Sequence, residues 1–355
     1  MKLNYKIGDI VEEVDVRNIN NDVDILLGLS IDKCFIKSVA NVIGTDLTKY
    51  KIISKYDFAV SLMQVSRDSK IPIACLQEYN KAIVSPAYHV FRIKDKNRIC
   101  PEYLELLFRR SEFDREAAYI AVGGVRGSMP WSEFCRINLS IPPIEKQLEI
   151  VHQYKVISDR IVLKQKINDK LKEVMQLIYE QTFVKNPLNI NWKNGVIGDV
   201  LQLQRGHDLP KEKMNGGKYP VIGSIEIIGY HNKFTTESPA IILGRSGNIG
   251  NPRIYFFNCW AHNTSLYVKN FYSVEPIWAL FLLKNLNYDN FVGGSAVPTL
   301  NRNVVHSFEI KIPPIELQRK FNNKMMVIFK MIDCNESEIQ ILKRIEKIIL
   351  SQLSE

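Results

Sequence analysis

Apolar residues near the end of the chain recur at alternating steps of four and three. This spacing predicts an α-helix whose apolar seam packs on a second helix, as in a coiled coil. One member is polar, Asn335, which either sets the register of the helix pair or marks a break in the helix. The seam continues approximately through Ile345, Ile349 and Leu353. Its members are Phe321, Met325, Ile328, Ile332, Asn335, Ile339 and Leu342.

A second amphipathic stretch lies in the middle of the chain, and its seam is interrupted at 164–169. The interruption predicts a bent or weakly packed segment. Two helices of about 40 residues would each be about 60 Å long. Because a lone amphipathic helix is unstable in water, we expect the two to pack on each other; two separate helical hairpins are the alternative. The apolar positions of this stretch are Ile144, Leu148, Val151, Ile161, Leu171, Val174 and Ile178.

The rest of the chain carries short apolar runs, such as 89–93 and 240–243, separated by glycine-rich turns such as 244–250. These features are typical of β-strands. Short helices are expected at 101–110 and 277–285. The predicted fold class is therefore α+β: two strand-rich domains in a pseudo-twofold repeat, joined by two long helices that pack as an antiparallel coiled coil.

An internal repeat organises the chain. The segment Ile-Pro-Pro-Ile-Glu-x-Gln at 141–147 recurs 171 residues later at 312–318, and Ile-Gly-Asp at 7–9 recurs at 197–199. A weaker match at an offset of 178 places Arg67 on Arg245. We predict four segments: a first strand-rich domain at 1–143, a first helix at 144–186, a second strand-rich domain at 187–314 and a second helix at 315–355.

The charge balance changes the picture of the partner. The chain of 355 residues has 47 Lys and Arg against 38 Asp and Glu, a formal net charge of +9. This excess favours a polyanion such as nucleic acid, although a basic protein without such a partner has the same composition. The sequence shows neither a run long enough for a membrane span nor a signal peptide, so a cytoplasmic location is expected.

Signatures of catalysis are weak in this sequence. Ser85-Pro86-Ala87-Tyr88 lacks the second proline of a methyltransferase motif, and the glycines at 244, 247 and 250 do not match a phosphate-binding loop. The six histidines and six cysteines have no metal-ligand spacing. We therefore predict a recognition module that is not an enzyme and that itself binds no cofactor or metal.

Residues that could contact DNA cluster in the polar loops. Arg and Lys read guanine edges, Asn and Gln read adenine, and small polar side chains reach either base. For each single residue, a solvated surface group is the alternative interpretation. The candidates are Gln64, Arg67, Asp68, Lys70, Tyr88, Arg126, Ser128, Arg205, His207, Lys211, Lys213, Lys218, His231, Asn232, Lys233, Arg245, Ser246, Asn248, Asn263, Ser295 and Arg302.

The duplicated Ile-Pro-Pro-Ile-Glu-x-Gln, each copy placed between a variable strand-rich domain and a long helix, resembles the specificity subunit of type I restriction–modification systems. Segments 59–73, 84–88 and 241–250 resemble the target-recognition domains of that family. The resemblance covers essentially the whole chain, although the chain is short for this family.

This resemblance implies a DNA-binding role in which each domain reads one half of a bipartite, asymmetric site and the helices set the gap. It implies two methyltransferase (modification) subunits as partners, which use S-adenosylmethionine. Restriction (motor-nuclease) subunits that use ATP and Mg²⁺ would join them where present. Two other interpretations stay open: a self-contained methyltransferase or nuclease with degenerate motifs, and a coiled-coil scaffold whose strand-rich domains bind protein.

Overall fold

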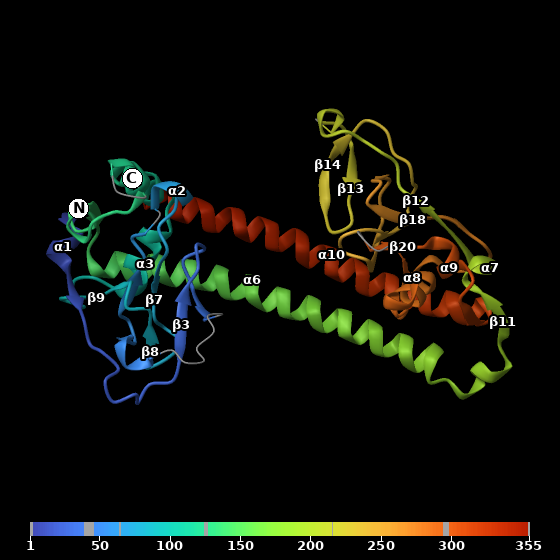
Figure 1. The fold of residues 1–355 in the computed structure, drawn as a ribbon, viewed down its shortest axis with the longest axis horizontal. Coiled ribbons are helices and arrows are strands. Elements are labelled where there is room, and N and C mark those ends of the chain that lie inside the picture. The colour runs from blue at the N-terminus through green and yellow to red at the C-terminus, as the bar shows by residue number, and fades with distance from the viewer. Residues whose placement is uncertain are drawn as a thin grey trace. The chain divides into compact units, whose positions relative to one another are not determined.

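The computed structural model describes residues 3–38, 46–63, 65–123, 127–214, 216–293 and 298–353. The chain divides into two compact units. The first unit comprises Met1–Lys164 and Glu338–Glu355, and the second comprises Gln165–Ser337. Each unit combines a strand-rich part with portions of two long helices, α6 (Ile144–Tyr179) and α10 (Ile315–Gln352), as Figure 1 shows.

The strand-rich part of the first unit contains two four-stranded sheets, with strand orders β2-β9-β6-β7 and β4-β3-β8-β5. Helices α3 and α4 cover the first sheet, and Phe58 and Phe91 stack in the core between them with ring centroids 5.2 Å apart. The elements are β1 (Leu3–Lys6), α1 (Ile7–Ile10), β2 (Val11–Val14), β3 (Leu26–Leu29), β4 (Phe35–Lys37), β5 (Lys51–Ser54), β6 (Phe58–Val60), α2 (Val65–Asp68), β7 (Ile73–Cys75), β8 (Lys81–Val84), β9 (His89–Ile93), α3 (Pro101–Arg109), α4 (Ser111–Ile120), α5 (Trp131–Phe134) and β10 (Asn138–Ile141).

The second unit repeats most of this topology, which confirms the internal repeat; its second sheet, β14-β13-β17, has three strands where the first unit has four. Its sheet β12-β18-β15-β16 matches β2-β9-β6-β7 strand for strand, and its parallel pair β13-β17 matches the parallel pair β3-β8. The elements are β11 (Lys193–Val196), α7 (Ile197–Val200), β12 (Leu201–Arg205), β13 (Tyr219–Ile222), β14 (Ile227–His231), β15 (Ala240–Gly244), β16 (Gly250–Tyr255), β17 (Trp260–Ala261), β18 (Ser265–Phe271), α8 (Pro276–Lys284), β19 (Val292–Gly293), β20 (Thr299–Leu300), α9 (Arg302–His306) and β21 (Glu309–Ile312).

The first and last strands of each strand-rich part pair with each other. β1 pairs antiparallel with β10, so that Leu3 lies opposite Ile141, and β11 pairs antiparallel with β21, so that Lys193 lies opposite Ile312. The long helices begin directly after the repeated Pro-Pro. The predicted helices at these two points are therefore confirmed, since proline is tolerated at a helix start and not inside a helix.

The glutamine of each repeated motif is buried and joins its long helix to a short helix that precedes it in the chain, α3 in the first unit and α8 in the second. The Gln147 side chain accepts a hydrogen bond from the Cys100 N–H at 2.9 Å and donates to the carbonyls of Arg98 and Pro142. The Gln318 side chain accepts from the Glu275 N–H at 3.0 Å and donates to the Pro313 carbonyl. Both glutamines therefore satisfy backbone groups at the starts of α3 and α8, which the helices themselves leave unpaired.

The seam of α6 differs from the prediction. Leu148 and Val174, which we expected in the seam, are exposed. The segment 164–169 is no break, because α6 continues through it. Polar residues simply occupy seam positions there. The buried and half-buried residues follow steps of three and four without interruption: Gln147, Ile150, Tyr154, Ile157, Ile161, Lys164, Asn168, Leu171, Met175 and Ile178.

The seam of α10 agrees with the prediction up to Leu342. The helix is continuous through Asn335, so this residue does not break it. Beyond Leu342 the seam passes through half-buried Glu346, whereas Ile345, which we expected there, is exposed; the predicted Ile349 and Leu353 are half-buried and buried, respectively.

Within each unit, α6 and α10 pack antiparallel. In the first unit, Ile157 and Ile161 pack against Ile339 and Leu342, and Lys164 Nζ lies 2.7 Å from a carboxylate oxygen of Glu338. In the second unit, the Asn335 amide donates to Asn168 Oδ1 at 2.8 Å, and Tyr179 contacts Phe321. None of the helices in the described ranges carries an apolar stretch that would allow it to cross a membrane.

Candidate nucleic-acid interface

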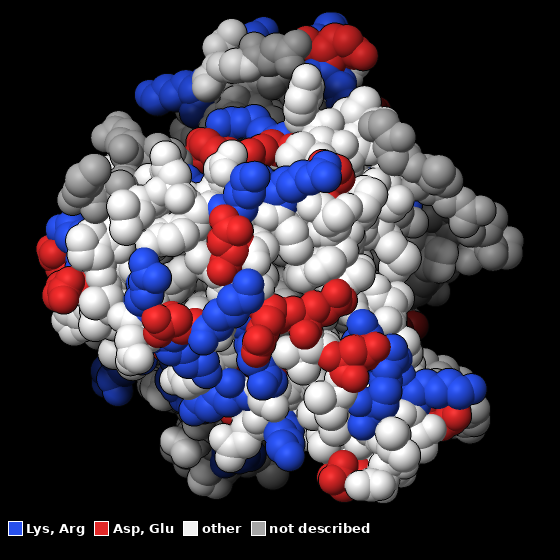
Figure 2. All heavy atoms as spheres, turned by 90° about the vertical axis from the view of Figure 1, so that its left-hand side faces the viewer, with Lys and Arg blue, Asp and Glu red and all other residues white. Residues whose placement is uncertain are grey.

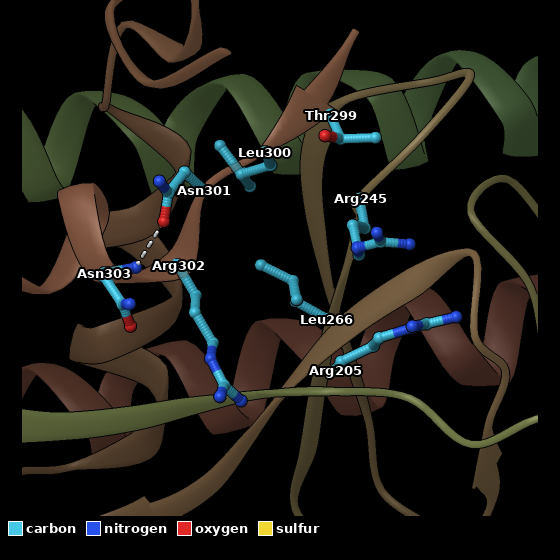
Figure 3. Close-up of a pocket in the computed structure, with 8 residues that line it drawn as sticks. All are labelled: Arg205, Arg245, Leu266, Thr299, Leu300, Asn301, Arg302 and Asn303. Atoms are coloured by element: carbon cyan, nitrogen blue, oxygen red, sulfur yellow. Dashed lines mark hydrogen bonds between the residues drawn. The ribbon is translucent and has the colours of Figure 1, made fainter. Parts of the chain in front are cut away.

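Three arginines predicted as DNA contacts line one hollow in the second unit. We call it the arginine hollow; its volume is about 550 Å³. In Figure 3, Arg205 and Arg245 extend in the same direction, and Leu266 lies between them and Arg302. The lining residues are Arg205, Arg245, Leu266, Thr299, Leu300, Asn301, Arg302 and Asn303.

Three different elements position these arginines. Arg205 is the last residue of β12, and Arg302 is the first residue of α9, whose N-cap is the Asn301 side chain. Arg245 follows β15, where its N–H donates to the Thr264 carbonyl at 2.9 Å and its own carbonyl accepts from the Leu300 N–H at 2.9 Å. The hollow is thus built on a sheet and on backbone hydrogen bonds, which hold the arginine backbones in fixed positions.

The arginine hollow is strongly cationic. Among the residues that the structure describes, no carboxylate lies within 4.0 Å of a guanidinium nitrogen of Arg205, Arg245 or Arg302. Arg245 Nη1 donates only to a neutral acceptor, the Asn263 carbonyl, at 3.3 Å. Uncompensated guanidinium groups on a surface attract anions and donate hydrogen bonds in a planar fork that suits phosphate and base edges.

Other predicted residues surround the hollow and make contacts of their own. Ser246 forms an isolated bridge with Thr299, and Asn248 accepts from the Asn251 side chain at 2.8 Å. The Asn263 amide donates to the Asp208 carboxylate.

A second group of predicted residues lies around the hairpin of β13 and β14. His231 Nδ1 lies 3.0 Å from the Lys213 carbonyl oxygen, so the turn that carries Lys211 and Lys213 packs on the end of β14. The Trp260 ring packs edge to face with the rings of His231 and His207, with ring centroids 5.1 and 6.0 Å apart. We call this group the hairpin surface; its predicted residues are His207, Lys211, Lys213, Lys218, His231, Asn232 and Lys233.

The candidates of the first unit are partly paired with carboxylates. In α2 the Arg67 guanidinium donates to both oxygens of Asp68, at 2.7 and 3.1 Å, and this ion pair lowers the pKa of Asp68. Lys70 Nζ lies 3.8 Å from Asp32. Ser128, another candidate, is half-buried and follows Gly127, which has a positive φ of 72° and lies so close to Ser66 that a Cβ there would clash with the Ser66 hydroxyl.

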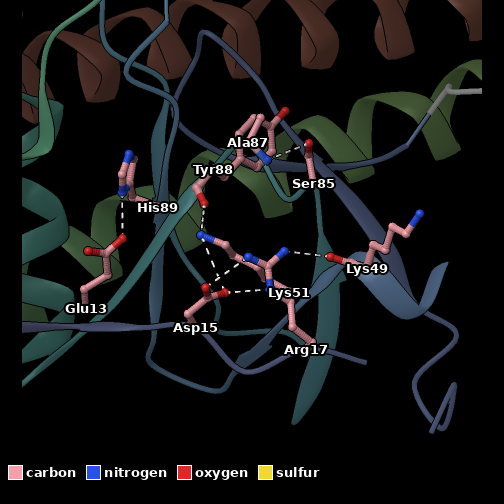
Figure 4. Close-up of polar contacts among 9 residues, drawn as sticks. All are labelled: Glu13, Asp15, Arg17, Lys49, Lys51, Ser85, Ala87, Tyr88 and His89. Carbon is pink, nitrogen blue, oxygen red and sulfur yellow. Dashed lines mark hydrogen bonds and ion pairs between the residues drawn. The ribbon is translucent and has the colours of Figure 1, made fainter. Parts of the chain in front are cut away.

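Tyr88 belongs to a turn between β8 and β9. The turn is closed by the Ser85 carbonyl, which accepts from the Tyr88 N–H at 3.1 Å, and the Tyr88 carbonyl accepts from Lys51 Nζ at 2.9 Å. Figure 4 shows this lysine beside Asp15, which also pairs with Arg17 at 2.8 Å. The segment around Ser85 is thus a turn tied into a network of ion pairs.

Charges of both signs are mixed on the face drawn in Figure 2, where Lys and Arg lie next to Asp and Glu. Short-range ion pairs such as Arg136–Glu133 at 2.6 Å and Arg115–Glu112 at 3.0 Å occur in the first unit. The fields of such oppositely charged neighbours largely cancel at a distance, and salt at 0.1 M screens what remains within about 10 Å.

The predicted equivalence of Arg67 and Arg245 is wrong. The Leu62 carbonyl accepts from the Met129 N–H at 2.9 Å, just as the Arg245 carbonyl accepts from the Leu300 N–H at 2.9 Å. Met129 and Leu300 correspond to each other at the offset of the Pro-Pro motif. Leu62 is therefore the counterpart of Arg245, and Arg67 lies in α2, a helical turn that follows this position.

Three candidates, Gln64, Arg126 and Ser295, lie outside the described residues. Sequence analysis missed Thr299, Asn301 and Asn303 in the hollow and Trp260 at the hairpin surface. The polar run Asn301-Arg302-Asn303 was a usable signal, but we singled out only its arginine.

In the ranges that the structure covers, no group of His, Cys, Asp and Glu side chains has the arrangement of a metal site.

Residues 189–347 match the family model for the type I restriction modification DNA specificity domain. The chain is 22% identical over 302 residues to the type I restriction enzyme MjaIX specificity subunit of Methanocaldococcus jannaschii, which covers 73% of this chain and 69% of that protein.

Two solved structures share the fold. The crystal structure of a type I restriction–modification S subunit from M. genitalium superposes with a TM-score of 0.62 at 14% identity, covering 99% of this chain and 96% of that one. A chain from a structure on complex assembly and conformational transition of the type I system has a TM-score of 0.53 at 16% identity, with 99% and 97% coverage. At these identities the likeness concerns the fold.

Proposed function

We propose that the chain is a DNA specificity subunit of a type I restriction–modification system and that each of its two units reads one half of a split DNA sequence. One observation carries this proposal: the two units share their strand order but present different residues at equivalent places. A shared scaffold supports two readers of the same kind, and different surfaces support an asymmetric target. Lysines and arginines would hold the DNA backbone, and loop side chains would select bases.

The long helices are the proposed spacer and docking element. They carry apolar side chains that are exposed in the single chain, and exposed apolar stripes mark interaction sites. We propose that two methyltransferase subunits dock on these stripes and that restriction subunits join where the system has them. The exposed apolar residues include Val156, Leu163, Ile167 and Val174 on α6, and Val327, Met331, Ile341 and Ile348 on α10.

In this proposal the chain supplies recognition and the partners supply the chemistry. S-adenosylmethionine would bind to the methyltransferase subunits, and ATP and Mg²⁺ to the restriction subunits. The chain itself would be non-catalytic and would act in the cytoplasm, where these partners meet DNA.

The test is a long-read methylome of cells that express the neighbouring methyltransferase with and without this chain. We expect a split adenine-methylated motif that disappears when the chain is removed, because the chain selects the site. Unchanged methylation with the methyltransferase expressed would contradict the proposal and favour a protein scaffold. Methylation by the purified chain alone would instead favour a self-contained enzyme.

A further inference from the structure

The two units differ most clearly at the arginine hollow. The repeat and the strand register give the counterparts of its residues in the first unit. Arg205 corresponds to Asp15, because Ile7-Gly8-Asp9 and Ile197-Gly198-Asp199 lead into β2 and β12 without an insertion. Arg245 corresponds to Leu62 through the backbone hydrogen bonds described above.

The counterparts of Arg302 and Leu266 are aromatic. Arg302 lies two residues after Leu300, and Trp131 lies two residues after Met129, so these two correspond. Leu266 is paired with Arg205 in the ladder, and its counterpart is His89. His89 and Trp131 stack on each other with ring centroids 5.0 Å apart, and His89 also contacts Glu13 at 2.7 Å. The place that is open and cationic in the second unit is therefore occupied by stacked rings and carboxylates in the first.

The shape of the arginine hollow limits what it can bind. Base edges lie at the floor of a groove that is about 8.5 Å deep in B-DNA, and a protein reaches them with protruding side chains. A concave site instead receives a group that protrudes from the duplex, and the groups that protrude are the backbone phosphates. An extruded base also protrudes, but it is held by stacking on aromatic rings. None of the described lining residues is aromatic.

The chemistry of the lining agrees with this shape. It offers three guanidinium groups, the side chains of Asn303 and Thr299, and an apolar floor formed by Leu266 and Leu300. Its described residues include no carboxylate that would repel an anion.

We propose that the arginine hollow binds phosphates of the DNA backbone and that the described residues at the equivalent place of the first unit form no such phosphate site. This inference rests on the proposed function. It assigns the arginine hollow to holding the DNA backbone in position and not to reading bases. The second unit would then hold DNA more strongly by charge, whereas the first would depend more on other contacts. Selection of bases by the second unit would fall to its other protruding residues.

The test measures the salt dependence of DNA binding by the full chain. The variant R205Q/R245Q/R302Q is titrated into two fluorescent duplexes, one carrying the motif found in the methylome and one with that motif scrambled. Each phosphate contact contributes about 0.9 to the slope of log K against log salt. We expect the slope to fall by about that amount for each phosphate lost, and affinity for both duplexes to fall by the same factor.

Two further variants serve as controls. K193Q/K269Q/K320Q removes the same charge from exposed lysines of the second unit outside the hollow and is expected to keep a slope close to that of the original chain. R205K/R245K/R302K keeps the charge and is expected to retain most of the slope, because a lysine ammonium also neutralises phosphate. Thermal denaturation of all three variants checks that each one folds.

The outcomes separate the inference from the proposed function. A glutamine variant with an unchanged slope would overturn the inference, and so would a loss confined to the motif duplex or a changed methylation motif in the lysine variant. If the methylome contains no motif that depends on the chain, the proposed function fails, and the slopes are then compared on the scrambled duplex alone. A reduced slope in the glutamine variant would still support the phosphate site.

Discussion

His306 is the last residue of α9, the helix that begins with Arg302. Its Nε2 accepts a hydrogen bond from the Leu203 N–H at 2.8 Å, which ties α9 to β12. Only a neutral imidazole has a free acceptor nitrogen. Burial lowers the pKa of His306, and nearby Arg302 lowers it further. At the scale of single residues, the arginine hollow is therefore supported by a hydrogen bond that needs an uncharged histidine.

This histidine predicts an acid-sensitive second unit. The pKa of His306 is lower in the folded chain than the value of about 6.5 in an unfolded one. Between these two pKa values the unfolded state therefore binds more protons than the folded state. The contribution of His306 to the unfolding free energy is present above about pH 6.5 and is lost as the pH falls through the pKa of the folded state. Urea unfolding at pH 5 to 8 should show this loss.

A variant assigns the effect to this side chain. H306L should lower the unfolding free energy at pH 8 by about 1 kcal/mol, since the Leu203 N–H loses its acceptor. The same variant should be less sensitive to acid. H152L, at an exposed histidine of α6, should retain the full pH dependence. An H306L variant as acid-sensitive as the original chain would show that the lost stability has another source.

At the scale of elements, the long helices show why a hydrophobic pattern predicts some packing and misses the rest. The helix starts followed from Pro-Pro, because proline restricts where a helix begins. The seam of α6 was partly misassigned because three of its positions, Gln147, Lys164 and Asn168, are polar. Each has a partner elsewhere in its own unit, and a search for apolar residues therefore selected exposed neighbours such as Leu148. These positions are identified only by their hydrogen-bond and ion-pair partners, which lie far away in the sequence and become known from the structure.

The asparagine pair predicts a coupled effect on stability. N335L alone leaves the Asn168 amide buried without its partner, and we expect a cost of about 1 to 3 kcal/mol in unfolding free energy. The double variant N168L/N335L should recover most of this loss, because apolar side chains then meet in the seam. Urea unfolding of both single variants and the double variant gives the coupling energy. Strictly additive losses would mean that the two residues do not act as a pair.

At the scale of the whole molecule, the repeat was the most informative feature of the sequence. It indicated two units of one topology, and the matching strand orders confirm this. The offset of 178 nevertheless misplaced Arg67 on Arg245, because α2 adds a helical turn that the second unit lacks at this point. Loop residues follow no periodicity, so their placement required the backbone hydrogen bonds.

The division into two units predicts that changes in one unit affect only one half of the target. N232A/K233A alters exposed residues just beyond β14 on the hairpin surface. If these side chains read bases, each lost contact costs about 1 to 3 kcal/mol of discrimination. A methylome of the variant should then show a relaxed motif on one side of the gap and an unchanged motif on the other. K193A, at an exposed lysine of β11, is the control, and altered bases on both sides would contradict independent reading.

The pairing of β1 with β10 and of β11 with β21 has a consequence for how such proteins can evolve. Each strand-rich part begins and ends at one antiparallel ladder, where Leu3 faces Ile141 and Lys193 faces Ile312. The chain therefore enters and leaves each module at neighbouring points beside a nearly identical seven-residue segment. Genetic recombination within the DNA that encodes these segments would exchange an intact module and leave the helices in register. Under the proposed function, one such event would give the chain a new half-target while the rest of the fold stays unchanged.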